Sequence, residues 1–340
     1  MKYVYVLTSS INDFYYEQFY LSASSLRLHN PDASIVVLLD SKTKEGLTDK
    51  RRGYEKVVSE IKTIEVPAEL SQIEISRWLK TSMRRYIQGD FLFIDCDTII
   101  AEDISSISGQ NIIFGACLDC HSLLNRHYNR NLFIDNDKKL GFTSYISNKH
   151  INSGIIFCSD TPETHKIFER WHELWLYSKS KSILRDQPSL NMAIYENQSY
   201  FTELDGIWNC QITANYLPFI ANAKIIHYFA TSLFMYSSPY LLASDTIFKK
   251  IKEQGIIPDS IIKLLNCPKN AFVAETRIFA GENMFYVLDS DLFKSLFFFQ
   301  KNMPMFYNFL NKLSSFFKKI TKSFMIRRSR KEDSGIKNYN

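Results

Sequence analysis

The pattern in this 340-residue chain with the clearest chemical potential is a pair of carboxylates, Asp95 and Asp97, that directly follows the apolar run 91–94. A short apolar run of this kind predicts a buried strand. Residues i and i+2 of an extended segment point the same way, so both carboxylates should face one pocket while Cys96 turns toward the core. Carboxylate oxygens suit Mg²⁺ or Mn²⁺ and the phosphates that accompany these ions. The pair indicates either a metal site or an ordinary solvated or capping strand end.

The elements that would position this pair follow from the apolar periodicity of the first hundred residues. Strands are expected at 3–7 and 35–39, the second ending at Asp40, with a helix over 15–29 between them. A further helix before the carboxylates is predicted by apolar residues at helical spacing, namely Ile75, Leu79, Met83 and Ile87. This alternation predicts an α/β fold with a mostly parallel sheet, whose ligands collect at the carboxyl ends of its strands.

Three more polar groups stand at the ends of predicted elements later in the chain. Residues 118–150 are polar and Asn-rich and are expected to form a loop or lid, after which Asn152-Ser153-Gly154 leads into a short apolar strand. Asp186-Gln187-Pro188 predicts a helix start, because proline suits a first helical turn. The apolar run 225–226 ends at His227.

In this order, Asp95-Cys96-Asp97, Asn152-Ser153-Gly154, Asp186-Gln187 and His227 resemble the motifs of the retaining glycosyltransferases of family 8. The resemblance spans residues 1–235 and implies the GT-A fold, a Rossmann-like, mostly parallel sheet flanked by helices. It implies an enzyme that moves a hexosyl unit from a UDP-sugar to a glycan or lipid-linked acceptor with retention of configuration. Synthesis of a surface polysaccharide or lipopolysaccharide would fit this activity.

The resemblance also implies a metal site made by Asp95, Asp97 and His227. In the family these positions bind Mn²⁺, which grips the diphosphate of the donor and stabilises the charge that develops on departing UDP. Asp95 is expected to divide its oxygens between the ion and the nucleotide. An imidazole beside two carboxylates favours Mn²⁺ over Mg²⁺. The alternative for His227 is a histidine satisfied within the core.

The other positions carried over by resemblance concern the sugar. Asp186 and Gln187 match the catalytic positions near the reacting face of the sugar, although neither is assigned as a nucleophile, and a helix N-cap is the alternative. Asn152, Ser153 and Gly154 are expected to present an amide and a bare backbone to the sugar hydroxyls. An ordinary turn before a strand is the alternative for this segment.

Basic and hydroxyl side chains complete the expected donor site. Arg77 and Lys80, together with Arg84, share one helical face, and the first two are candidates to contact the diphosphate or sugar rather than solvent. The nucleobase candidates follow the first strand, and they are Thr8, Ser9 and Tyr15. Asp40 is a weaker candidate at the end of the second strand.

One segment departs from the family pattern. Family members continue from the metal-binding histidine into a glycine and a Lys-Pro-Trp that closes over the diphosphate, whereas His227 is followed by Tyr228-Phe229-Ala230-Thr231. The lysine contact therefore has no counterpart at this position. Either another cation serves or the closing segment differs.

Composition separates a catalytic part from a basic tail. Residues 292–331 hold ten Lys or Arg and no acidic residue, so the net charge of +5 comes from the tail, and nucleic-acid binding by the folded domain is not expected. An apolar stripe at helical spacing predicts a cationic amphipathic helix, and its residues are Phe309, Leu313, Phe316, Phe317, Ile320 and Phe324. Such a helix would bind an anionic membrane surface, or alternatively pack on its own domain or on a second subunit.

The expected domain organisation follows from these patterns. The catalytic domain covers 1–240, with a nucleotide-sugar half at about 1–115 and an acceptor half at about 116–240. A helical or mixed accessory segment at 241–290, the basic amphipathic tail at 291–331 and a disordered terminus at 332–340 complete the chain.

The expected location is the cytoplasm, peripheral to the inner face of the membrane. The chain shows no signal-peptide pattern and no apolar segment near the roughly 20 residues that span a bilayer. Its six scattered cysteines suit reduced thiols, and Cys117-Leu118-Asp119-Cys120 is expected to be structural rather than a metal or redox motif.

Two other functions fit the carboxylate pair. A phosphatase of the haloacid-dehalogenase type would use Asp95 as a nucleophile, but the later acidic strand end that such enzymes need is not found. A non-catalytic nucleotide-sugar-binding scaffold at the membrane is the second alternative.

Overall fold

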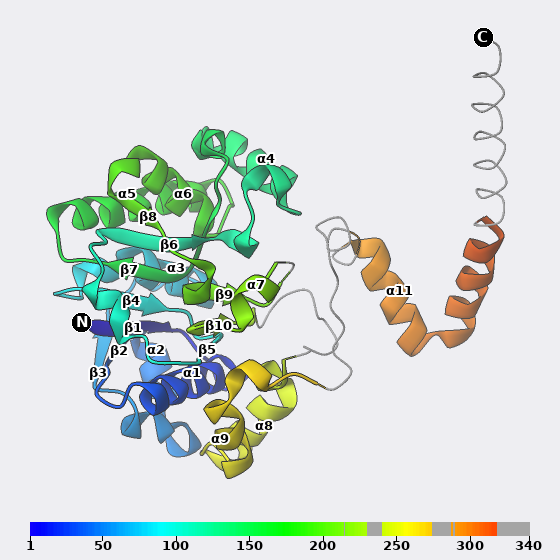
Figure 1. The fold of residues 1–340 in the computed structure, drawn as a ribbon, viewed down its shortest axis with the longest axis horizontal. Coiled ribbons are helices and arrows are strands. Elements are labelled where there is room, and N and C mark those ends of the chain that lie inside the picture. The colour runs from blue at the N-terminus through cyan, green and yellow to red at the C-terminus, as the bar shows by residue number, and fades with distance from the viewer. Residues whose placement is uncertain (214, 230–239, 274–286, 288–289, 318–340) are drawn as a thin grey trace, which may run out of the picture. The chain divides into compact units, whose positions relative to one another are not determined.

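The computed structural model describes residues 1–213, 215–229, 240–273, 287 and 290–317 (Figure 1). The chain divides into two compact units, Met1–Glu282 and Asn283–Asn340. The first unit contains every strand assigned in the described residues.

A seven-stranded sheet runs through the centre of the first unit (Figure 1). In spatial order its strands are β3 (Glu60–Ile64), β2 (Ser34–Asp40), β1 (Lys2–Leu7), β4 (Phe91–Ile94), β7 (Ile151–Cys158), β6 (Phe114–Leu118) and β8 (Phe201–Glu203). The pairings from β3 to β4 and between β6 and β8 are parallel, and only β7 runs antiparallel to its two neighbours. The predicted mostly parallel sheet is therefore confirmed.

Helices cover both faces of this sheet, because each central strand sends alternate apolar side chains to opposite sides. In β1, Tyr3, Tyr5 and Leu7 belong to one core, and Val4 and Val6 belong to the other. The first core includes α1 (Tyr15–His29), α8 (Asp245–Gln254) and α9 (Asp259–Asn266). The second includes α3 (Gln72–Ser82), α5 (Pro162–Ser180) and α6 (Gln187–Glu196).

A second, three-stranded sheet lies beside the first core and was not predicted. Its order is β5 (Thr98–Ile100), β10 (Ile225–His227) and β9 (Cys210–Gln211). Strand β10 is antiparallel to β5 and parallel to β9. Strand β10 contains the expected apolar run 225–226, whereas β5 and β9 were not expected. The sheet brings His227 next to the segment that follows β4.

The predicted helices are found close to their expected bounds. Helix α1 covers 15–29 as predicted, and α3 begins after a capping box in which Ser71 and Glu74 exchange hydrogen bonds with each other's backbone amides. The polar segment 118–150 is more ordered than a loop, because it contains α4 (Arg130–Leu140) and several short 3₁₀ turns. The two remaining short α-helices in the described residues of this unit are α2 (Ser41–Glu45) and α7 (Leu217–Ile220).

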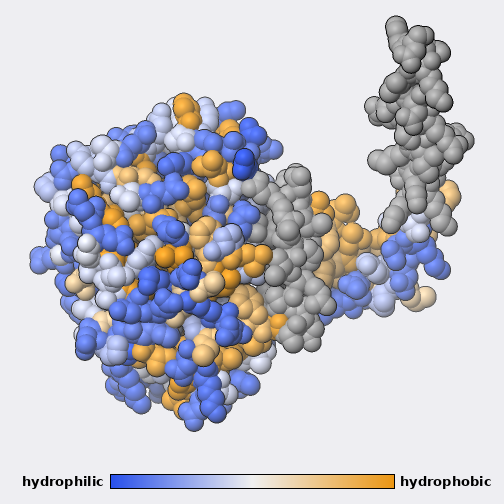
Figure 2. All heavy atoms as spheres, viewed as in Figure 1, coloured by the Kyte–Doolittle hydropathy of each residue, from blue (hydrophilic) through white to orange (hydrophobic). Residues whose placement is uncertain are grey.

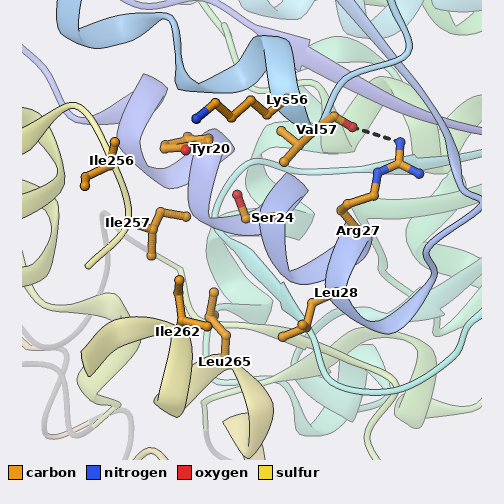
Figure 3. Close-up of a pocket in the computed structure, with 10 residues that line it drawn as sticks. All are labelled: Tyr20, Ser24, Arg27, Leu28, Lys56, Val57, Ile256, Ile257, Ile262 and Leu265. Atoms are coloured by element: carbon orange, nitrogen blue, oxygen red, sulfur yellow. Dashed lines mark hydrogen bonds between the residues drawn. The ribbon is translucent and has the colours of Figure 1, made fainter. Parts of the chain in front are cut away.

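An apolar groove of about 560 Å³ separates α1 from the segment that joins α8 to α9 (Figure 3). Tyr20 and Leu28 line it on one side, and Ile257 and Ile262 on the other. None of the residues that line this groove belongs to the predicted site.

The described part of the second unit is helical and buries no side chain in α11 (Asp291–Asn302). Hydrophobic side chains gather on the surface of this helix (Figure 2), and Leu292 is 73% exposed. A further helical stretch, 304–317, exposes Phe309 and Phe316 to 60% each. Ile320, Phe324 and the expected terminus at 332–340 lie outside the described residues. No helix in the described residues is long and apolar enough to cross a membrane.

Candidate active site

The carboxylate pair lies where the chain passes from the large sheet to the small one. Strand β4 ends at Ile94, residues 96 and 97 form a bend, and β5 begins at Thr98. The expectation of a continuous extended segment was wrong, because the chain must turn here to change sheets. The thiol of Cys96 donates a hydrogen bond to the Val6 carbonyl, so this side chain does turn inward as predicted.

The fold brings the three predicted metal ligands together. Strand β10 pairs with β5 so that His227 stands opposite Thr98, and the Tyr228 amide donates to the Asp97 carbonyl. Ligand atoms of Asp95, Asp97 and His227 all lie within 4.8 Å of one another. His227 Nε2 lies 3.2 Å from Asp97 Oδ1.

The hydrogen bonds of His227 make this group suitable for a cation. Nδ1 lies 3.0 Å from Asn209 Oδ1, an acceptor, so Nδ1 carries the ring proton and donates it. The lone pair of neutral His227 is then on Nε2 and faces a carboxylate oxygen. Two acceptors at 3.2 Å repel unless a proton or metal ion lies between them. Two carboxylates and one imidazole lone pair suit Mn²⁺, so these residues fit the implied metal.

Gly154 leaves room for the imidazole of His227. A Cβ atom built on Gly154 would lie 2.4 Å from His227 Cε1 and 2.9 Å from Asn152 Oδ1, and no real Cβ makes such contacts. A side chain here would push His227 out of line with Asp97. The position of the His227 imidazole therefore explains why residue 154 is a glycine. The predicted contact of Gly154 with a sugar stays a prediction.

Lys80 and Arg77 form ion pairs with the carboxylates of the site rather than facing solvent. Lys80 Nζ lies 3.0 Å from both oxygens of Asp95 and 3.5 Å from Asp186 Oδ2. Arg77 Nε lies 3.1 Å from Asp186 Oδ1. Arg84 is also buried but pairs with Asp160, so it does not join this cluster. Only the first two basic residues of the predicted helical face meet the site.

Asp186 contributes a negative charge to this cluster instead of capping α6. Its side chain makes no capping hydrogen bond to the helix. Burial alone would raise the pKa of Asp186, but the positive charges of Lys80 and Arg77 and a hydrogen bond from Ser153 lower it to about 2. The carboxylate is ionised at neutral pH and aligns the two cations.

Asp95 titrates differently from Asp186. Burial raises the pKa of Asp95 above its usual range, and the negative charge of Asp97 adds to this rise, although Lys80 opposes it. A divalent ion between the two carboxylates would relieve this repulsion. The chemistry of the pair thus favours a bound cation.

Gln187 and Asn152 meet at a carboxylate that the motifs did not include. Gln187 Nε2 donates to Asp119 Oδ1 over 3.2 Å, and Asn152 Nδ2 donates to the same oxygen over 2.7 Å. Asp119 is buried, and His127 Nε2 lies 3.1 Å from its other oxygen. Asp119 is therefore a further candidate of this site.

A pocket of about 460 Å³ opens beside the carboxylate pair, and its size suits a nucleotide. Thr8 and Tyr15 line it as predicted, together with Arg77, Asp95 and Asp97. Two other candidates for the nucleotide side, Ser9 and Asp40, do not line it. Ser9 donates its hydroxyl to Asp13, and Asp40 caps α2 by accepting from the Lys42 amide.

The segment after His227 is described for two residues only. The ring of Phe229 stacks on the imidazole of His227 with 4.1 Å between centroids. Phe229 has a φ of 49°, in the left-handed region that an aromatic residue rarely adopts. Ala230 and Thr231, where the family closes over the diphosphate, lie outside the described residues.

Three residues of the site were missed from sequence. Asp119 directly follows strand β6, so the rule that placed Asp95 at a strand end would also have found it. Asp13 lines the pocket and accepts hydrogen bonds from Ser9, Ser10 and Gln72. Asn209 has no sequence signal, because its role depends on which side chain it meets in the fold.

The sequence matches glycosyl transferase family 8 over residues 6–232. No curated protein matches the chain by sequence.

Solved structures of glycosyltransferases resemble the fold. An active-site mutant of LgtC is 14% identical over 76% of this chain and 98% of its own, with a TM-score of 0.50. The apo form of the bifunctional WbbM is 16% identical over 75% of this chain and 51% of its own, also with a TM-score of 0.50. Mouse xyloside xylosyltransferase 1 is 13% identical over 67% of this chain and 97% of its own, with a TM-score of 0.44. At these identities the likeness to the first two shows the fold alone.

Proposed function

The chain belongs to glycosyl transferase family 8 and is a glycosyltransferase, as the motif order predicted, and we propose that it transfers a hexosyl unit from a UDP-sugar in a reaction that depends on Mn²⁺ or Mg²⁺. The observation that supports the metal is the convergence of Asp95, Asp97 and His227, with His227 Nε2 3.2 Å from Asp97 Oδ1, at the edge of a nucleotide-sized pocket. Asp95, Asp97 and His227 would hold the ion, which stabilises negative charge on the departing diphosphate.

The remaining residues of the site have proposed roles that follow from their positions. Thr8 and Tyr15 line the pocket on the nucleoside side, and Ser9 supports them through Asp13. Lys80 and Arg77 supply fixed positive charge next to Asp95 and Asp186, where a phosphate or the sugar would lie. This pair is the proposed replacement for the lysine that the family carries after its histidine.

The sugar is proposed to lie between the carboxylate pair and Gln187. Asp186 holds Arg77 and Lys80 in place, while Asn152, Ser153 and Gln187 border the same region from β7 and α6. We assign the donor half to about 1–115, the acceptor half to about 116–240, the accessory segment to 241–290 and the tail to 291–331. A glycan or lipid-linked acceptor and retention of configuration complete the proposal.

The test is UDP release by the purified protein from a panel of UDP-sugars, with and without Mn²⁺. A glycosyltransferase of the proposed kind releases UDP from one of them, more slowly when the metal is chelated, and product analysis then gives the linkage. A phosphatase would release inorganic phosphate instead, and a scaffold would release nothing. Metal-independent UDP release would contradict the proposed cofactor.

The second unit is proposed to bind an anionic membrane surface. Its described helices expose aromatic side chains, including Phe309 and Phe316, beside Lys294, Lys301 and Lys312, and exposed apolar patches of this kind mark interaction surfaces. Each basic residue near such a surface contributes about 1 kcal/mol. This surface would place the enzyme at the inner face of the cell membrane, near a lipid-linked acceptor.

Sedimentation with liposomes tests this surface in the full-length protein. A variant in which Phe309, Leu313 and Phe316 are changed to Ser should lose binding to anionic liposomes. The control changes the exposed polar residues Asn308 and Asn311 to Ser and should bind like the wild type. Equal binding by both variants would show that these helices do not make the contact.

A further inference from the structure

A chain of hydrogen bonds joins Asp119 to His227 through two buried asparagines. Asn152 Nδ2 donates to Asp119 Oδ1 over 2.7 Å, and Asn209 Nδ2 donates to Asn152 Oδ1 over 2.9 Å. Asn209 Oδ1 then meets His227 Nδ1 at 3.0 Å. The four residues come from separate segments of the chain and are at most 6% exposed.

The Gly154 amide determines the donor and the acceptor of every hydrogen bond in this series. The Gly154 amide donates to Asn152 Oδ1 over 2.9 Å, which identifies that atom as the oxygen of the side-chain amide. Asn152 Nδ2 must then face Asp119, and Asn152 Oδ1 also accepts from Asn209 Nδ2. Asn209 is left with only its oxygen to offer His227.

The carboxylate at the far end supports the same direction. Burial would raise the pKa of Asp119, but the hydrogen bonds that it accepts from His127 and Asn152 bring it below its usual range. An ionised carboxylate only accepts hydrogen bonds, so Asp119 cannot donate to Asn152 and the order of donors and acceptors cannot be reversed. The backbone amide and the carboxylate are independent constraints that agree.

We propose that Asn209 is a positioning residue that fixes His227 as the Nδ1–H tautomer, with Nε2 aimed at Asp97 and available to a divalent cation. Asn152, held by Asp119 and Gly154, orients Asn209. Gly154 contributes a second constraint, because the absence of a Cβ allows the imidazole to lie against the backbone. Metal-bound histidines commonly gain orientation and basicity from such a hydrogen bond on the other ring nitrogen.

The inference rests on the metal-binding role in the proposed function, but it can be tested without any sugar. The first measurement is the tautomer of His227 in wild-type, metal-free protein, from two-bond ¹H–¹⁵N spectra near pH 8. The His227 signals are identified by their loss in His227→Gln. The expected result is a protonated Nδ1 and an unprotonated Nε2. A protonated Nε2, or an even mixture of tautomers, would overturn the proposal.

The second measurement is the affinity of the metal-free protein for Mn²⁺ alone, followed by the electron paramagnetic resonance of the free ion. Asn209→Leu keeps the approximate shape and removes both hydrogen bonds, and it should raise the Kd for Mn²⁺ by about 10- to 100-fold. Its His227 should also show mixed tautomers. An unchanged Kd in a folded variant would contradict the positioning role.

Asn30→Leu is the matched control. Asn30 is likewise buried and uses both side-chain atoms, accepting from the Ile104 amide and donating to the Glu102 carbonyl, and it does not line the nucleotide pocket. This variant should lose stability but keep the wild-type Kd for Mn²⁺. Equal weakening of Mn²⁺ binding in both variants would show a general structural effect and overturn the assignment.

The two proposals fail in different ways. If wild-type protein shows the expected tautomer and Mn²⁺ affinity but releases UDP from no sugar nucleotide, the proposed function fails and the positioning role stands. If it releases UDP while Asn209→Leu binds Mn²⁺ normally, the proposed function stands and the positioning role fails.

Discussion

Among the described residues of the first unit, two clusters of side chains could hold a metal ion, and they differ in the hydrogen bonds of their histidines. Asp95, Asp97 and His227 form one, and the other consists of Asp119, Cys120 and His127. In each cluster the potential ligand atoms lie within 4.8 Å of one another. The histidine lies 3.2 Å from a carboxylate oxygen in the first and 3.1 Å in the second.

The hydrogen bond on the far ring nitrogen distinguishes the two histidines. Nδ1 of His127 accepts from the Asn129 backbone amide over 3.0 Å, so Nε2 carries the proton and donates it to Asp119. Nδ1 of His227 instead meets the oxygen of Asn209, so Nε2 presents a lone pair to Asp97. In the second cluster the histidine donates its proton to the carboxylate, whereas in the first a proton or a metal ion must lie between Nε2 and Asp97.

Exposure reinforces this difference. All three residues of the second cluster are buried, while Asp97 and Asp95 border the nucleotide pocket. The comparison teaches that residue types and spacing do not identify a metal site. The two clusters are distinguished by the atom that is hydrogen-bonded to Nδ1 of each histidine, which is a donor in one case and an acceptor in the other.

The largest expected effect comes from removing a ligand of the first cluster. Asp97→Ala should abolish measurable Mn²⁺ binding and lower UDP release by about 10³-fold, since a bound metal contributes several kcal/mol to stabilising the leaving group. The check is steady-state UDP release over a Mn²⁺ titration. Full Mn²⁺-dependent turnover in this variant would remove Asp97 from the site.

The next effect concerns Lys80, which forms an ion pair with Asp95 of the first cluster. Lys80→Met leaves Asp95 and Asp186 without their shared partner and should lower the free energy of unfolding by about 3 kcal/mol, as expected for breaking a buried pair. Mn²⁺ should then raise the Tm of the variant more than that of the wild type, because Asp95 has both oxygens available.

The control for this variant is Lys62→Met. Lys62 pairs with Glu60 at the surface, and such a pair contributes about 0–1 kcal/mol. Calorimetry with and without Mn²⁺ measures both variants. Similar losses of stability in the two would argue that Lys80 is not a buried counter-charge.

A smaller, pH-dependent effect is expected beside the second cluster. Burial lowers the pKa of His150 to about 4, although the charge of Asp119 opposes this shift. The unfolded chain then binds the proton more readily, so stability contributed by neutral His150 is complete above about pH 6.5 and is lost as the pH falls toward 4. His150→Leu should flatten the stability profile between these values in urea unfolding. An unchanged slope would contradict a neutral, buried His150.

The smallest effect is expected at the cysteine of the second cluster. Cys120→Ser keeps a donor toward Asp119 and should change neither the Kd for Mn²⁺ nor UDP release by more than about twofold, because we expect the ion to bind at the first cluster. The same titration used for Asp97→Ala provides the readout. A large rise in the Kd would mean that the second cluster binds the metal.

Sequence reasoning predicted the first cluster because each of its ligands stands at the end of an apolar run. It predicted α1, α3 and the central strands for the same reason, since periodicity is a local property. It named Lys80 as a candidate but could not show that Lys80 pairs with Asp186, because that contact joins α3 to the start of α6.

Asn209 and the opposite tautomers of the two histidines could not be predicted. The series of hydrogen bonds from Asp119 to His227 depends on side-chain contacts between the residue after β6, strand β7, the turn before β9, and strand β10. The small sheet that assembles them has strands of two or three residues. The run in β10 was expected, but β5 and β9 and their pairing with β10 gave no periodic signal.

The most direct test of the account is anomalous diffraction from crystals soaked with Mn²⁺ and UDP. The account predicts an anomalous peak within coordination distance of His227 Nε2 and the Asp97 carboxylate, with none at Asp119 and His127. A peak at the second cluster, or none at the first with UDP bound, would contradict it.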